Sequence, residues 1–101
     1  MGAGTNVLEL LADMTERAID QSSLDDRTNQ LVRLAALVAV DAPPASYKLN
    51  LGVAADLGIG VQEVESVLAV IAPIVGTARI ASASGNIVRA LGVPLDSPEL
   101  S

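Results

Sequence analysis

Apolar residues recur along the chain at helical spacing, and almost no stretch alternates as a strand would. In the first segment they follow one another at steps of four, three and four: Val7, Leu11, Met14 and Ala18. Asn6 followed three residues later by Glu9 resembles a capping box, so we expect this helix to begin at Asn6. It should fade between residues 20 and 23.

Two further helices are expected before residue 59. Asp25 has a carboxylate that can accept hydrogen bonds from the free amides of a first turn, so a second helix should open there. Its apolar face carries Leu31, Leu34, Ala35 and Val38. Asp41 and the pair Pro43 and Pro44 end it, because proline disfavours helical geometry in the residue before it. The same prolines begin a third helix, which should end at Gly58.

The fourth helix should begin near Gly60 and Glu63 and is apolar around most of its circumference. A helix that is apolar on nearly all sides is usually buried, so we expect this one at the centre of the assembly. Pro73 lies inside it and predicts a kink or an early end. A fifth helix should run over residues 77–91 and stop at residues 92–94.

A face of small residues distinguishes the fifth helix: Ala78, Ala81, Ser82, Ala83, Ser84 and Gly85. Small side chains let two backbones approach closely, and the face is interpreted either as packing within the chain or as a contact between subunits. Together the helices predict an all-α fold. We expect a single domain over residues 1–94 and a flexible C-terminal tail over residues 95–101.

Composition narrows the range of partners. Of the 101 residues, 50% are hydrophobic and only 18% are charged, which is more apolar surface than a small monomer hides and favours a homo-oligomer. The net charge of -6 repels phosphate backbones, so no nucleic-acid partner is expected. The apolar stretches are too short for a membrane span. The first residues do not resemble a targeting signal, so we expect a cytoplasmic protein with no membrane partner.

The sequence contains no cysteine and no histidine. This excludes thiol redox chemistry, disulfides and imidazole ligands. A metal site would have to be built from carboxylates and carbonyls, and a general base from Asp, Glu, Lys or Tyr with a displaced pKa. No pattern for a metal or an organic cofactor is present, so we expect neither.

The stretch over residues 24–81 resembles the carboxymuconolactone decarboxylase and alkylhydroperoxidase D-like (AhpD-like) family. The resemblance is carried by four segments in order: the opening over residues 24–28, the apolar run over residues 31–40, the segment over residues 50–59, and residues 63–76. It implies an orthogonal bundle of helices that assembles as a trimer or a hexamer.

Redox-active members of this family carry Cys-x-x-Cys at the entry to the third helix, followed four residues later by His. Aligned on Gly58, these positions fall on Pro43, Ser46 and Asn50. The hydroxyl of Ser46 is neither acidic nor oxidisable as a thiol is, so thiol-dependent peroxidase activity is predicted to be absent. The glutamate of the family's proton relay falls on Gln30, or on Leu31 if the loop length differs.

The decarboxylase branch of the family needs no cysteines, but its usual histidine again falls on Asn50. Tyr47 and Lys48 precede Asn50 and are the weak candidates for proton transfer. Arg33, Asn50 and Arg79 are the candidates for binding a small carboxylated ligand. The alternative is that these are surface charges and that Tyr47 is simply an amphipathic residue.

Two functions therefore remain open. The chain is interpreted first as a non-redox, catalytically degenerate member of the family that serves as an oligomeric scaffold or binds a small ligand or partner. The alternative is a cofactor-independent lyase or isomerase that acts on a small carboxylated substrate. The sequence leaves open the substrate, the number of subunits and whether a cysteine-containing paralogue assembles with this chain.

Overall fold

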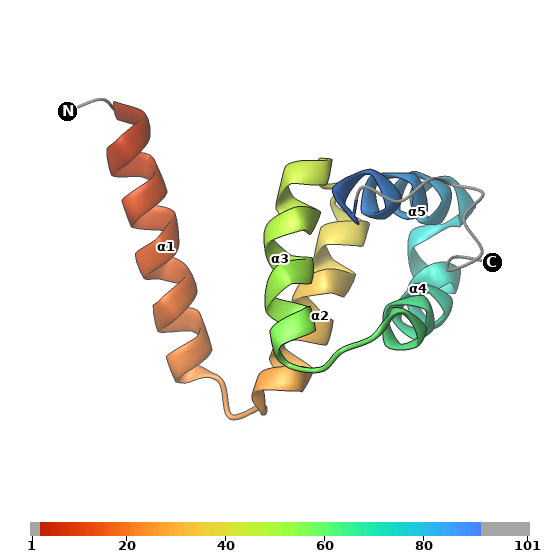
Figure 1. Cartoon of the computed structure of the whole chain (residues 1–101), viewed down its shortest axis with the longest axis horizontal. Helices are drawn as coiled ribbons and strands as arrows, with labels where there is room; N and C mark the ends of the chain where they lie inside the picture. The colour runs from red at the N-terminus through yellow and green to blue at the C-terminus, as the bar shows by residue number, and fades with distance from the viewer. Residues whose placement is uncertain (1–2, 92–101) are drawn as a thin grey trace.

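The computed structural model of the chain describes residues 3–91, with side chains described from residue 6 onward. This part folds into five α-helices and contains no strand, which confirms the predicted all-α fold. The helices are α1 (Ala3–Gln21), α2 (Asp26–Ala39), α3 (Pro44–Asp56), α4 (Val61–Val75) and α5 (Thr77–Leu91) (Figure 1). The predicted stop at residues 92–94 and the predicted tail over residues 95–101 lie outside the described residues.

Several helix ends lie where the sequence predicts them. The carboxylate of Asp25 accepts a hydrogen bond from the amide of Thr28 at 2.7 Å and caps α2. Pro44 is the first residue of α3, where its missing amide costs nothing. Gly58 follows α3 with φ 76°, the left-handed conformation that favours glycine.

The predicted start of the first helix is wrong, because α1 begins at Ala3 and Asn6 therefore lies inside it. The capping-box pattern of Asn6 and Glu9 also fits a helix interior, and no neighbouring element holds Asn6 in the extended conformation of a cap. Pro73 does not end the fourth helix at its own position. Helix α4 continues for two residues beyond Pro73 and ends before Gly76, which has φ 89°.

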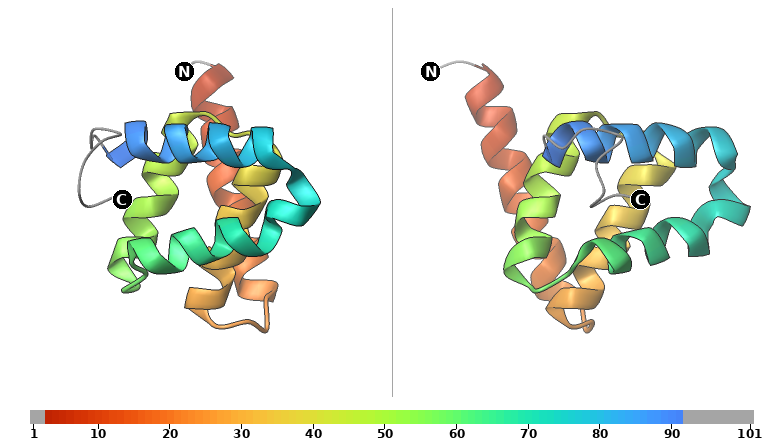
Figure 2. Two further views of the ribbon diagram at one scale, coloured as in Figure 1. Left: turned by 90° about the vertical axis from the view of Figure 1, so that its right-hand side faces the viewer. Right: turned by 45° about the vertical axis from the view of Figure 1, so that its right-hand side comes forward.

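Helices α2 and α3 lie side by side, and α4 and α5 cross them, so the four form an orthogonal bundle (Figures 1 and 2). One part of the core gathers around Tyr47, which is fully buried against Val38, Ala42, Ala83 and Ile87. A second part contains Leu34, Ala54 and Ile59. The core therefore lies among α2, α3 and α5.

Helix α4 does not occupy the centre, and this corrects the prediction from its apolar circumference. None of its residues is fully buried, and Val70 and Ile74 are 75% and 84% exposed. Its inner face, with Val64, Leu68 and Ile71, packs against the core, while Val70 and Ile74 stay exposed among the described residues. A helix that is apolar around its whole circumference is expected to be buried on both sides, but in the described residues only the inner side of α4 is packed.

Helix α1 stands apart from the bundle. In the described part of the chain, the packed helix pairs all involve α2 to α5 (Figure 1). From Asn6 to Gln21 every side chain of α1 is exposed except that of Thr15, which is half-buried. The domain core is therefore built by residues 26–91 alone.

Candidate functional site

The positions that correspond to the family's redox residues come together where α3 packs on α2. Ser46 and Asn50 are four residues apart, so they lie on the same face of α3, one turn above the other. That face meets Gln30 of α2. Pro43 precedes α3 as its N-cap residue and is exposed.

Gln30 and Asn50 form a buried polar network. The Nε2 atom of Gln30 donates to the backbone carbonyl of Asn50 at 3.0 Å and to its Oδ1 at 3.2 Å. The Nδ2 atom of Asn50 in turn donates to the carbonyl of Ser46 at 2.9 Å. Gln30 and Asn50 are 5% and 9% exposed. Of the two counterparts left open for the relay glutamate, Gln30 and not Leu31 therefore contacts Asn50.

This network cannot carry out proton relay chemistry. Carboxamides do not gain or lose a proton near neutral pH, and both donors are already engaged with backbone or amide oxygens. Buried polar groups that are fully hydrogen-bonded stabilise a packing arrangement without offering a reactive atom. The geometry is that of a structural link between α2 and α3.

Tyr47 is a core residue whose hydroxyl is also buried, so its interpretation as an amphipathic residue is wrong. Its side chain is fully buried, and its hydroxyl has no hydrogen-bond partner among the described residues. Burial raises the pKa of Tyr47, and the nearby carboxylate of Asp41 raises it further. The phenol is therefore neutral at ordinary pH, and none of the hollows described below reaches it.

The candidate cations are not gathered into an anion pocket. Lys48 lies on the outer side of α3 and lines a shallow hollow with Leu49, Gly52 and Asp56. Arg33 is half-buried on α2, and Arg79 is exposed in the first turn of α5. Three hollows of residues 3–91 lie between or on the helices, and none of these three is lined by Arg33, Asn50 or Arg79.

An apolar cavity of about 320 Å³ lies elsewhere, between α3, α4 and α5. Aliphatic side chains such as Leu51, Val64, Leu68 and Ile87 line it, with Glu65 as its one charged residue. The sequence analysis missed this cavity. Periodicity places these residues on inward faces but does not say whether the faces meet without a gap.

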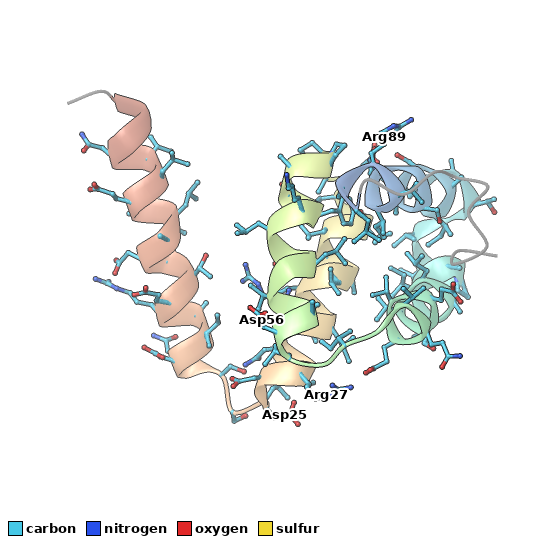
Figure 3. The ribbon with its side chains drawn as sticks, in the orientation of Figure 1. Asp25, Arg27, Asp56 and Arg89 are labelled. Atoms are coloured by element: carbon cyan, nitrogen blue, oxygen red, sulfur yellow. The ribbon has the colours of Figure 1, made fainter. Side chains whose placement is uncertain are left out.

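Arg27 makes a surface link that the sequence analysis also missed. Its Nη1 atom donates to the carbonyl of Leu57 at 2.9 Å, and its Nη2 atom pairs with the carboxylate of Glu63. The hydrogen bond from Arg27 lowers the pKa of Glu63, and those from Thr28 lower the pKa of Asp25. Figure 3 shows Asp25 and Arg27 together at the base of the bundle. Arg27 thereby joins the start of α2 to the end of α3 and the start of α4.

Two kinds of feature are absent from residues 3–91. No group of three or more carboxylates is placed to hold a metal ion there. Nor does any helix in this range have the length and apolar content needed to cross a membrane.

Comparison with known proteins gives a family but no individual relative. The sequence model of the carboxymuconolactone decarboxylase family matches residues 5–86. Neither the curated proteins nor the solved structures contain a match to the chain.

Proposed function

We propose that this chain, which belongs to the carboxymuconolactone decarboxylase family, is a non-redox and catalytically degenerate member that serves as a homo-oligomeric scaffold or binding protein. The observation that carries the proposal is the network of Gln30 and Asn50. Amides replace the ionisable groups of the family's relay and are satisfied by each other and by the backbone.

The proposed loss of peroxidase activity follows from the residues at the site. Peroxide reduction in the family requires a thiolate that attacks the O–O bond and a second thiol that resolves the resulting sulfenic acid. Pro43 and Ser46 supply neither. Tyr47, the residue after Ser46, packs fully into the core beside Val38 and Ile87 and so offers no reactive group there.

The proposed homo-oligomer is supported by the apolar surface that the single chain leaves uncovered. Leu8, Leu49, Val70 and Ile74 are all more than two-thirds exposed and are spread over α1, α3 and α4. Exposed apolar patches of this extent are typical of protein interfaces. A trimer or a hexamer is the assembly that family membership favours.

The decisive experiment is a hydroperoxide reduction assay of the purified chain with a dithiol as electron donor. We expect the rate to equal that of the dithiol alone, which is the control. A rate above that background would overturn the proposed loss of redox function. Light scattering of the same sample tests the oligomer, and a mass of 10.3 kDa at micromolar concentration would overturn it.

The lyase alternative has its own assay, with small carboxylated lactones as substrates. We expect no turnover, because Tyr47 is fully buried and neither Arg33 nor Arg79 lines any of the three hollows described above. Turnover that disappears in Lys48→Met or Tyr47→Phe would replace our proposal with the lyase. Turnover that persists in both would overturn the degenerate assignment and exclude these two residues as its acid or base.

A further inference from the structure

Helix α1 has an uncovered apolar face that runs along most of its length. Its exposed large apolar residues are Val7, Leu8, Leu10, Leu11, Met14 and Ile19. With 19 residues the helix is about 28 Å long. At 100° per residue its acidic residues, such as Glu9 and Glu16, fall on the opposite face. Figure 3 shows the side chains of α1 that end in oxygen or nitrogen mainly on the side away from α3.

Helix α3 has a second apolar face that is also uncovered. Its inner side is buried through Tyr47 and Ala54, but on its outer side Leu49 and Val53 are 73% and 43% exposed. These two residues line the hollow that contains Lys48, Gly52 and Asp56. Figure 3 shows Asp56 on the side of α3 that faces α1. A helix with apolar residues on both sides is typically covered on both.

The outer face of α3 is open at Gly52, where a second helix could pack closely. A Cβ atom added to Gly52 would meet no other atom within 4 Å, so the surface is open at this point. Small residues let a second backbone come close, and Leu49 and Val53 flank Gly52 in the same hollow.

The connection between α1 and α2 holds α1 away from the bundle. The hydroxyl of Ser22 donates to Oδ1 of Asn29 at 2.7 Å, and the amide of Leu24 donates to the Ser22 hydroxyl at 3.1 Å. The Nδ2 atom of Asn29 donates to the carbonyl of Leu24 at 3.3 Å. This short, hydrogen-bonded loop opposes closure of α1 onto its own α3.

Charge selects the outer face of α3 among the three apolar hollows. Helix α1 carries four carboxylates and one arginine. The cavity between α3, α4 and α5 contains Glu65, the groove between α2 and α4 contains Glu63, and neither is lined by a base. Lys48 lies at the outer face of α3 and balances Asp56. An acidic helix is therefore repelled least at α3.

We propose that α1 is an exchanged arm, whose apolar face packs against the outer face of α3 in a second copy of the chain. This inference rests on the homo-oligomer proposed above and names its contact. One chain carries both halves of the contact, so two copies related by a twofold axis cover two arms and two α3 faces at once. Lys48 then lies at the edge of the contact and is the only basic residue that lines the α3 hollow.

The natural absence of cysteine makes a direct test possible, because any disulfide must join introduced residues. The Met14→Cys variant carries a mass tag and is mixed with one untagged variant at a time, and each mixture is oxidised mildly. The untagged variants are Leu49→Cys, Gly52→Cys and Val53→Cys. A disulfide forms only where the two Cα atoms approach within about 7 Å. We expect at least one mixture to give a tagged–untagged dimer.

The matched control is Glu16→Cys, which places the thiol on the polar face of the same helix. We expect it to cross-link several-fold less than Met14→Cys. Equal cross-linking of the two donors, or no mixed dimer with any of the three acceptors, would overturn the exchanged arm. So would a chain bearing both Met14→Cys and Leu49→Cys that links within itself at high dilution.

A second measurement needs no cross-link. Leu49→Glu places a charge in the proposed contact and should weaken self-association about tenfold or more in light scattering. Val40→Glu, at a site just after α2 that is equally exposed at 71%, is the control and should leave association unchanged. If Leu49→Glu does not change the oligomer, the exchanged arm is overturned but the proposed oligomeric scaffold is not. If the native chain is a monomer, both proposals are overturned.

Discussion

Helices α1 and α5 have the same kind of sequence pattern but opposite environments. Both carry apolar residues along one side at helical spacing. In α5 this side is covered by α3, so that Ala83 and Ile87 are 1% and 8% exposed. In α1 the matching residues Leu11 and Met14 are 51% and 55% exposed. The comparison teaches that periodicity predicts which side of a helix favours burial, but not which part of the assembly buries it.

The connections of the two helices explain the difference. Only Gly76 separates α4 from α5, and its positive φ turns the chain back so that α5 lies across α3. Residues 22–25 instead lead from α1 into a loop that is pinned to Asn29. Once the chain is directed outward, no residue of the bundle can reach the apolar side of α1.

The small residues of α5 also divide between inside and outside. Ala83 is buried and the hydroxyl of Ser82 donates to Oδ1 of Asp41 at 2.7 Å, so this part of the face serves packing within the chain. Ala78 and Ala81 are exposed. The interpretation as packing therefore holds for one half of the face, and a subunit contact stays a prediction for the other.

The largest expected change in the free energy of unfolding comes from truncating a side chain on the buried side of α5. Ile87→Ala should lower the free energy of unfolding by about 2–5 kcal/mol, because it opens a cavity beside Tyr47. Leu11→Ala in α1 should change it by less than about 0.5 kcal/mol at concentrations where light scattering shows the chain to be dissociated. Urea unfolding followed by circular dichroism measures both. Equal costs would break the contrast between α5 and α1.

A smaller effect is expected for the buried polar network. Asn50→Ala leaves the Nε2 atom of Gln30 without its side-chain acceptor and should cost about 1–3 kcal/mol of unfolding free energy. Asn6→Ala on the exposed arm removes the same amide and is the control, with a change below about 0.5 kcal/mol. A cost for Asn50→Ala no larger than that for Asn6→Ala would contradict the structural role of the network.

Substituting one glycine in α3 and one in α5 separates effects on helix stability from effects on association. Gly52→Ala should stabilise the dilute monomer by about 0.5–1 kcal/mol, since the added methyl group meets open space and alanine favours a helix. Gly85→Ala in α5 should do the same, because its methyl group meets only Arg89 at 3.6 Å. At associating concentrations the two variants should diverge, because only Gly52 lies in the proposed contact. Sedimentation measures the association of both variants. If Gly52→Ala and Gly85→Ala associate equally well, this contradicts the proposed contact between α1 and α3.

The smallest effect expected at neutral pH concerns the hydroxyl of Tyr47. Because burial raises its pKa in the folded chain, the unfolded chain loses the proton first, and stability should fall as the pH rises above about 10. Tyr47→Phe should remove this alkaline loss and leave stability at neutral pH unchanged or slightly higher, since the hydroxyl has no partner among the described residues. Tyr47 is the only aromatic residue, so tyrosinate absorbance reports its ionisation alone. Ionisation at the ordinary pKa would contradict its burial.

Much of the fold could be predicted from local chemistry. Asp25, Pro44 and Gly58 act within one turn of their own position, and their roles as cap, helix start and helix end follow from backbone geometry. The candidate site was predictable only as a set of positions. That Gln30 and not Leu31 reaches Asn50 depends on how α2 is rotated against α3, which one residue of shift would reverse.

By itself, the sequence determined the number of helices, their inward faces and the absence of any thiol or imidazole, because these depend on residue identity and on spacing within one helix. Only the tertiary structure decided that Tyr47 is buried, that α4 is half uncovered and that α1 stands alone. These outcomes depend on contacts between residues far apart in the chain. Their energy comes from surface removed from water, and a sequence pattern states how much apolar surface exists but not which surfaces meet.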